Sequence, residues 1–415
     1  MTARPASILV VGAVVAFAAV VHARQRDQIG PIADWAIVPE PLPSPAGKNT
    51  TEPQFTTQGG HTILSWLELA GTHTVLKFAE RTAAGWSDVR AAAGGNDFMV
   101  NSADVPSVRL LADGTLVAHW LQEDGPDPES YKLRLSRSKD GGRTWSAPVS
   151  PHRDKVQTQH GFASLFQAPG ADLGLVWLDG RAIKPDAPEG VGNMALRSAI
   201  LDANGAEGPE TVVVPRVCEC CQTAAAATSE GIIVAYRNRS ADEIRDIYVT
   251  RLVKGSWTAP ARVHDDGWRI TGCPINGPAI SARGRDVGVA WFNGKDDQGH
   301  SFVAFSHDAG RTFGPPVRVD DAGSLGRVSV ELLDGTSAIV TWVETSSQPS
   351  RFSARRVDDH GVRGAVVAVG DSSGTRYPRL ARFGDEVLFA WTAVESGVPR
   401  VVAAHARIPV RGGSR

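Results

Sequence analysis

The sequence predicts an all-β fold, a β-propeller with seven four-stranded blades and with six blades as the alternative. Short apolar segments that end in an aromatic residue recur at spacings of 54, 57, 59, 55, 51 and 49 residues. A strand repeat near 50 residues is typical of a propeller, in which each blade buries its faces against its neighbours. The aromatic residues that end these segments, called the marker aromatics below, are Trp66, Trp120, Trp177, Tyr236, Trp291, Trp342 and Trp391.

Each repeat reads as four strands in the same order. In the second repeat an alternating strand at 105–111 leads through the hairpin signal Asp113-Gly114 into the apolar strand 116–120. A polar loop then precedes a third strand at 132–136, and a fourth follows at 145–149. The pattern predicts antiparallel blades with no helix of comparable length.

The N-terminus is expected to be an export signal. Arg4 precedes the uncharged stretch 8–21, which is shorter than the roughly 20 residues that a membrane helix needs. Cleavage after 21–23 would give a periplasmic or secreted protein without a membrane anchor, and an uncleaved anchor is the alternative. The signal peptide is therefore placed at 1–23.

The rest of the chain is divided into a short segment and one domain. Residues 24–46 are rich in proline, which argues against a helix there. Within them, 35–38 resembles the fourth strand of a blade and is expected to close the ring. Residues 47–415 are expected to form a single propeller domain. The formal net charge is −2, with no long run of like charges, which argues against nucleic acid as a partner.

Two turns carry a specific motif. Residues 138–145 fit S-x-D-x-G-x-T-W, and 306–313 fit it with Phe for Trp. They resemble the Asp-box, or BNR repeat, of sialidases and related propellers. The aspartate and hydroxyl side chains of such a turn hydrogen-bond turn amides, so its expected role is structural. The resemblance implies a carbohydrate or a small acidic molecule as ligand, and, if the chain is an enzyme, a glycoside hydrolase of the exo-α-sialidase type.

Counting fifteen residues back from each marker aromatic predicts the residues that rim one mouth of the channel. Arg376 lies in Arg376-Tyr377-Pro378, which resembles the sialidase motif whose arginine binds the substrate carboxylate, and guanidinium suits that role chemically. An offset of one residue would substitute Asp104 and Gly161. The counted residues are Thr51, Val105, Phe162, Cys221, Asn276, Arg327 and Arg376.

Loops after the apolar strands add further candidates near this mouth. The ligand-binding candidates are Arg327, Arg376, Arg181, Arg237, Asn276 and His160, and the catalytic candidates are Asp104, Asp179 and Tyr377. By the resemblance, an aspartate would act as acid and a tyrosine as nucleophile, with Glu123 or Glu331 as its carboxylate partner. The chain departs from the family because Arg376 opens the last repeat, not the first.

The four cysteines form a cluster in the repeat. Cys218 and Cys273 stand eighteen residues before Tyr236 and Trp291, so they hold equivalent positions on adjacent blades. In an exported protein they predict two disulfides, with Cys218 or Cys220 bridged to Cys273. The alternative is a soft-metal site for copper or zinc, because thiolates select these ions. Its ligands would be Cys218, Cys220, Cys221 and Cys273.

Three functions therefore remain open at this point. The first is a sialidase-like propeller that binds, and as a further option hydrolyses, an acidic or carbohydrate ligand without a cofactor. The second is a non-catalytic binding or scaffold propeller. The third is a metal or thiol site built on the cysteine cluster.

Overall fold

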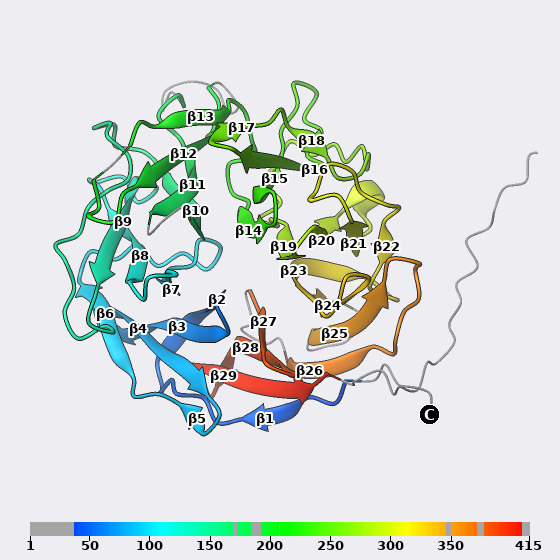
Figure 1. Ribbon diagram of the computed structural model, residues 1–415, viewed down its shortest axis with the longest axis horizontal. Coiled ribbons are helices and arrows are strands. Elements are labelled where there is room, and N and C mark those ends of the chain that lie inside the picture. Colours follow the sequence, from blue (N-terminus) through cyan, green and yellow to red (C-terminus); the bar gives the residue numbers. More distant parts are fainter. Residues whose placement is uncertain are drawn as a thin grey trace, which may run out of the picture.

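A computed structural model describes residues 37–168, 172–183, 192–206, 208–345, 350–371 and 377–408. Seven antiparallel sheets stand around a central channel, which confirms the predicted seven-bladed all-β propeller (Figure 1). Within these ranges the one helical element is η2, a single 3-10 turn at Lys295–Asp297. No helix in the described part of the chain combines the length and the apolar character that crossing a membrane requires.

Blades one to four take their strands in chain order. Blade one contains β2 (Thr50–Gln58), β3 (His61–Ala70), β4 (His73–Thr82), β5 (Gly85–Trp86) and β6 (Arg90–Gly95), and blade two contains β7 (Ser107–Leu110), β8 (Leu116–Glu123) and β9 (Tyr131–Ser138). Blade three contains β10 (His160–Gln167), β11 (Leu173–Asp179), β12 (Ala195–Leu201) and β13 (Thr211–Val214). Blade four contains β14 (Ala224–Thr228), β15 (Gly231–Arg237), β16 (Ile247–Val253), β17 (Ser256–Trp257) and β18 (Ala261–Arg262). In blade two, a single bridge between Leu135 and Val149 takes the place of the fourth strand.

Blades five to seven complete the ring. Blade five contains β19 (Ala279–Arg283), β20 (Asp286–Asn293), β21 (His300–Ser306) and β22 (Val317–Arg318). Blade six contains β23 (Ser324–Leu332), β24 (Ser337–Glu344), β25 (Arg351–Asp358) and β26 (Val367–Asp371). Blade seven contains β27 (Arg379–Phe383), β28 (Glu386–Glu395), β29 (Val398–Arg407) and β1 (Glu40–Leu42). The innermost strands are β2, β7, β10, β14, β19, β23 and β27 (Figure 1).

The ring closes between the two ends of the described chain. β1 pairs antiparallel with β29, with Leu42 opposite Ala403, so the last blade takes its outer strand from the N-terminal segment (Figure 1). The closing strand therefore begins later than the expected 35–38. Ile37 and Val38 lie outside any strand, and the rest of that segment and the expected signal peptide lie outside the described residues. The strand tolerates Pro41 because it forms the outer edge of its sheet.

The marker aromatics form the core between blades. All seven are buried, and Trp177, Trp291 and Trp342 have no exposed surface. Trp291 packs with Ile233 and Val249 of the preceding blade, so one hydrophobic cluster joins two sheets. Full burial of such a side chain stabilises the fold by about 2–3 kcal/mol. Because each blade buries an aromatic at the same position, the aromatics recur at regular spacings in the sequence.

The two motif turns share one hydrogen-bonding scheme. Asp140 accepts hydrogen bonds from the backbone N–H groups of Arg143 and Thr144 at 3.0 and 2.9 Å, and from the hydroxyl of Ser138 at 2.8 Å. Asp308 accepts the same three bonds from Arg311, Thr312 and Ser306. Because each carboxylate is used within its own turn, these aspartates stabilise the turn and take no part in the site described next.

Candidate functional site: an arginine-lined channel

The central channel holds a cavity of about 220 Å³ that the innermost strands of all seven blades line. On each of these strands, one lining residue stands opposite the residue that precedes the marker aromatic. These seven residues, called the channel ring below, are Gln54, Ser107, Ser164, Ala224, Ala279, Ser329 and Arg379. Six of them are small or uncharged, so Arg379 is the charged member of the ring.

Two further arginines line the same cavity. Arg109 belongs to β7 and Arg327 to β23, so the three guanidiniums come from three different blades. Within the described ranges, no hydrogen bond or ion pair connects the guanidinium of Arg109 with another residue. Burial lowers the pKa of Arg109 and of Arg379 to about 10, which leaves both cationic at neutral pH. A partly buried cation without an anionic partner, as at Arg109, is costly.

Tyr377 lines the cavity and stands in the sequence between β23, which carries Arg327, and β27, which carries Arg379. The guanidinium carbons of Arg327 and Arg379 lie 5.3 and 5.7 Å from the centre of its ring. Its hydroxyl donates a hydrogen bond to the carbonyl oxygen of Ile275, and burial raises its pKa. The ring thus holds two cations by cation–π contact.

Asp104 places a carboxyl group in the same cavity. It is buried, and its Oδ2 accepts a hydrogen bond from the backbone N–H of Phe162 at 2.5 Å. Burial outweighs that bond and raises the pKa of Asp104 to about 7. A side chain on Gly161 would lie 2.0 Å from the same oxygen, so the carboxyl group requires glycine at that position. The cavity therefore combines three cations with an acid that holds its proton near neutral pH.

Three innermost strands begin with strained backbone at the channel mouth. Glu52, Phe162 and Arg327 have φ values of 55, 52 and 56°. The pairing register of β2, β10 and β23 shifts at these residues, as at a β-bulge. Bulges redirect side chains, and such strain concentrates at functional sites. Asn276 stabilises one of the three, since its Oδ1 accepts the backbone N–H of Arg327 at 2.8 Å.

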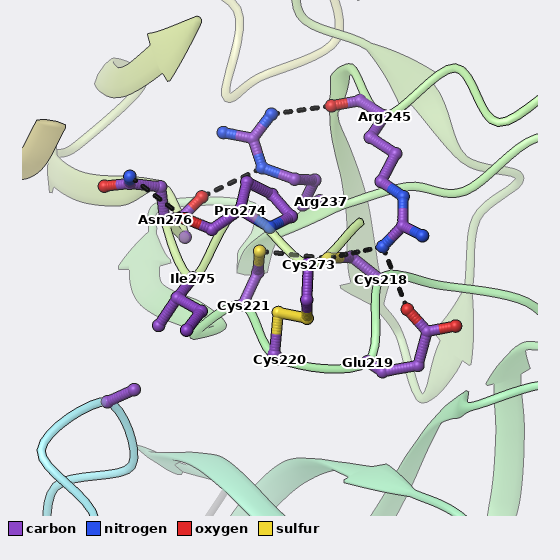
Figure 2. The surroundings of a disulfide bond; sticks show 12 residues. Cys218, Glu219, Cys220, Cys221, Arg237, Arg245, Cys273, Pro274, Ile275 and Asn276 are labelled. Carbon is purple, nitrogen blue, oxygen red and sulfur yellow. Dashed lines mark hydrogen bonds and ion pairs between the residues drawn. A yellow bond between two sulfur atoms is a disulfide. The ribbon is translucent and has the colours of Figure 1, made fainter. Parts of the chain in front are cut away.

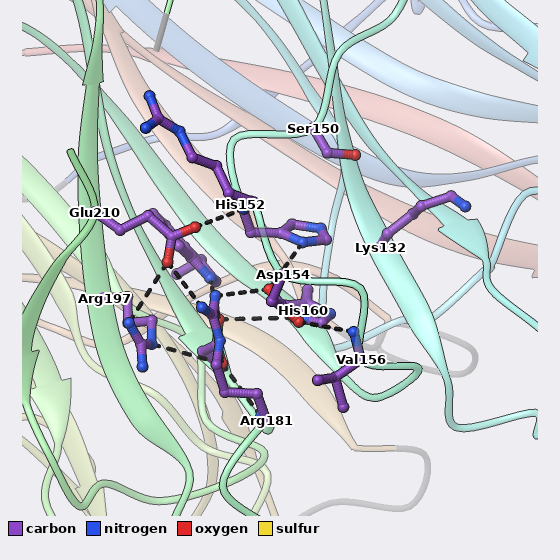
Figure 3. A network of polar contacts seen from close by, with 12 residues as sticks. Lys132, Ser150, His152, Asp154, Val156, His160, Arg181, Arg197 and Glu210 are labelled. Atoms are coloured by element: carbon purple, nitrogen blue, oxygen red, sulfur yellow. Dashed lines mark hydrogen bonds and ion pairs between the residues drawn. The ribbon is translucent and has the colours of Figure 1, made fainter. Parts of the chain in front are cut away.

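His160 and Arg181 belong to a separate polar network outside the cavity lining (Figure 3). Asp179 joins both of them in this network. Arg181 donates to Asp179 through Nε at 2.7 Å and Nη2 at 2.6 Å, and it also pairs with Asp154 and Glu210. Burial opposes ionisation of Asp179, but the hydrogen bonds from Arg181 lower its pKa overall. An ionised, paired Asp179 is poorly suited to act as an acid, and the charge of Arg181 is already balanced.

Two stacked imidazoles complete this network. The rings of His152 and His160 lie 3.9 Å apart, and Nε2 of His160 lies 3.2 Å from Oδ2 of Asp154. Burial and the neighbouring His160 lower the pKa of His152 to about 4. His152 lies in the loop that leads into β10 and His160 is the first residue of that strand, so their shared contact with Asp154 ties the loop to the strand.

Arg237 has a structural role that the sequence does not reveal. Its Nε, Nη1 and Nη2 donate to the carbonyl oxygens of Asn276, Arg245 and Phe292 at 2.9, 2.6 and 2.8 Å. Asn276 in turn donates to the carbonyl oxygens of Pro274 and Leu325. Both predicted ligand-binding side chains are thus engaged with backbone, joining blades four, five and six.

The cysteines are close together at the loops that open blades four and five (Figure 2). Cys220 and Cys273 form a disulfide, which is one of the predicted pairings. Cys218 and Cys221 are buried free thiols with their sulfur atoms 3.0 Å apart. Burial opposes ionisation of Cys218, but hydrogen bonds from Cys221 and the Cys220 N–H, together with the charge of Arg245, lower the pKa of its thiol below the usual value.

Several predicted residues lie elsewhere. Arg376 falls outside the described residues. Glu123 and Glu331 are described, and neither lines the cavity. Residue counting missed Arg109 and Arg379, which lie deeper on their strands. The missed signal was an arginine within an innermost strand, where most other blades carry small residues.

Comparisons with known proteins support the fold. A scan against protein-family models finds no match, and no curated protein matches the chain. Among solved structures, the polysaccharide lyase Uly1 has a TM-score of 0.55 at 10% identity, covering 86% of this chain and 90% of that chain. The α-L-arabinofuranosidase of Fusarium graminearum has 0.47 at 14%, covering 75% and 96%. The Hadza microbial sialidase Hz136 has 0.41 at 17%, covering 71% and 63%. The likeness to Uly1, at this low identity, shows a shared fold and nothing further.

Proposed function

We propose that this chain is an exported carbohydrate-binding propeller that holds an acidic sugar in its central channel. The observation that carries the proposal is the convergence of Arg109, Arg327 and Arg379 on one cavity. A guanidinium matches the two oxygens of a carboxylate, and its hydrogen bonds to an anion are stronger than those between neutral groups. The ligand's carboxylate would supply the anion that Arg109 lacks among the described residues.

The rest of the cavity suits a single sugar residue. Ser107, Ser164 and Ser329 of the channel ring carry hydroxyl groups that can exchange hydrogen bonds with sugar hydroxyls. A volume of about 220 Å³ lies below the range typical for drug-sized ligands. We therefore expect the terminal residue of an acidic glycan, or a free acidic monosaccharide, to enter the channel.

Two observations outside the cavity support parts of this proposal. The polysaccharide lyase Uly1 shares the fold over most of the chain, although fold likeness alone does not transfer a substrate. The Cys220–Cys273 disulfide favours an oxidising compartment, in line with the export signal expected from the sequence.

Glycoside hydrolysis is a second candidate, and Asp104 is the residue that favours it. A carboxyl group with a pKa of about 7 can donate a proton to a leaving oxygen at neutral pH. Tyr377 is less suited to the nucleophile role of a sialidase. Its hydroxyl donates to a backbone carbonyl instead of a carboxylate, and burial raises its pKa. Binding is therefore better supported than turnover.

Calorimetric titration tests the binding proposal. The probes are sialic acid and glucuronic acid saccharides, each paired with its carboxyl-reduced counterpart. We expect an acidic probe to bind at least tenfold more tightly than its reduced form, which is a difference of about 1.4 kcal/mol. Equal affinity for the two forms, or no binding of any acidic probe, would refute the role assigned to the arginines. Release of a fluorescent aglycone from a bound glycoside would show that the protein also hydrolyses its ligand.

A further inference from the structure

Four sulfur atoms gather where blades four and five meet, and they differ in exposure. The sulfur atoms of Cys218, Cys220 and Cys273 all lie within 4.8 Å of one another, and that of Cys221 is 3.0 Å from Cys218. Cys218 and Cys221 are 1% and 2% exposed, whereas Cys273 is exposed. A buried dithiol thus lies in contact range of a disulfide that opens to solvent (Figure 2).

The protein holds a cation against Cys218. Nη1 of Arg245 lies 3.3 Å from the Cys218 sulfur and donates to it. The same guanidinium pairs with Glu219 at 2.9 Å and Glu243 at 3.1 Å, and it is buried. These contacts fix its position, so the positive charge stays beside Cys218 and favours its thiolate over its thiol. Cys218 and Cys221 also have the Cys-x-x-Cys spacing in which one thiolate is commonly activated.

We propose that the four cysteines form a thiol–disulfide relay, in which the buried pair Cys218 and Cys221 exchanges with the Cys220–Cys273 disulfide. Cys273, which is an exposed residue, would connect the relay to a small or protein disulfide outside. This proposal does not rest on the saccharide proposal, because it uses other residues and another chemistry.

Each exchange step conserves atoms and electrons. The Cys218 thiolate attacks the Cys273 sulfur, a Cys218–Cys273 bond forms, and the Cys220–Cys273 bond breaks with its electron pair leaving on Cys220. The Cys221 thiol then loses its proton and attacks Cys218, and the electron pair leaves on Cys273. The two leaving thiolates take up protons, one of them the proton that Cys221 lost. The buried pair is oxidised to a disulfide and the exposed pair is reduced to two thiols, which an external disulfide reoxidises.

Disulfide trapping tests the relay. The Cys221→Ser variant removes the resolving thiol, so the Cys218–Cys273 intermediate should accumulate. The matched control is Cys218→Ser, which removes the attacking sulfur and should retain the Cys220–Cys273 bond. After acid quenching and maleimide blocking, cleavage at Glu219 separates Cys218 from Cys220, so peptide mass mapping distinguishes the two linkages. We expect the Cys218–Cys273 linkage in the first variant and the Cys220–Cys273 linkage in the second.

A second measurement uses the unmodified chain, in case a variant does not fold. The full-length protein is equilibrated in glutathione buffers of increasing oxidation and mapped in the same way. The relay predicts reversible interconversion between a Cys218–Cys221 form and a Cys220–Cys273 form at equal total thiol count. The proposal is overturned if Cys218 never links to Cys273 in the folded Cys221→Ser variant. It is also overturned if the isolated chain holds one equivalent of zinc or copper on four unbridged thiolates.

Discussion

The guanidinium carbon of Arg327 lies 5.3 Å from the centre of the Tyr377 ring, although the two residues belong to neighbouring blades. The same ring receives Arg379 from its own blade at 5.7 Å. Two guanidiniums near one ring make this part of the channel positive, and a positive potential attracts anions. This relationship underlies the acidic ligand proposed above.

Arg237 should contribute to the stability of the fold and not to ligand binding. Arg237→Met removes three donors from backbone carbonyls, and buried carbonyls without partners cost about 1–3 kcal/mol each. We expect the free energy of unfolding to fall by about 3 kcal/mol or more in urea denaturation. The folded fraction should bind the acidic saccharide with an affinity within twofold of wild type. A large loss of affinity without a loss of stability would reverse this assignment.

Asp104 should give the stability of the protein a distinctive pH dependence. Its pKa is raised from 3.8 to about 7 in the folded state, so folding favours the protonated form. This contribution is complete below about pH 4 and is lost as pH rises through 7. Asp104→Asn does not titrate. Its unfolding free energy relative to wild type should therefore increase by up to about 4 kcal/mol between pH 4 and pH 8.

Urea denaturation of both proteins at several pH values checks this prediction. Contributions from all other groups cancel in the difference between variant and wild type. A difference that stays constant across the range would mean that Asp104 ionises normally in the folded protein.

Gly161 should be intolerant of the smallest side chain. Its Cβ would lie 2.0 Å from Oδ2 of Asp104 and 2.7 Å from Cε2 of Tyr131. We expect Gly161→Ala to destabilise the fold by about 1–3 kcal/mol, the usual cost of overpacking. The control is Gly47→Ala, because no atom lies within 4 Å of the added methyl group. Equal thermal midpoints for the two variants would contradict the packing around Asp104.

The fold was predictable from the sequence because one buried marker aromatic identifies each of the seven blades. Each marks a strand buried between two sheets, so the repeat survives in the sequence even though the loops vary in length. The closing strand was misplaced because 35–38 resembles the fourth strand of a blade, whereas the pairing begins at Glu40. Pro41 fits within that strand because it lies at a sheet edge, where the missing N–H costs little.

The site was predictable only in outline. Counting from the marker aromatics placed Asp104 and Arg327 at the channel, where both line the cavity. It could not anticipate the bulges that shift the register of β2, β10 and β23. It also could not show that carbonyl oxygens occupy Arg237, because those carbonyls come from other loops. Arg379 was overlooked because the motif drew attention to Arg376.

Titration of an acidic saccharide into Arg379→Met and Arg382→Met tests the central claim most directly. Both arginines lie on β27, but only Arg379 lines the cavity, while Arg382 donates to the carbonyl oxygens of Gly384 and Leu333. The account predicts that Arg379→Met weakens binding of the acidic form by about 10- to 100-fold, as expected for loss of a charged hydrogen bond. Arg382→Met should bind both the acidic and the carboxyl-reduced form like wild type, whereas Arg379→Met should lose most of the preference for the acidic form. Equal affinities of the two variants for the acidic form would contradict the account.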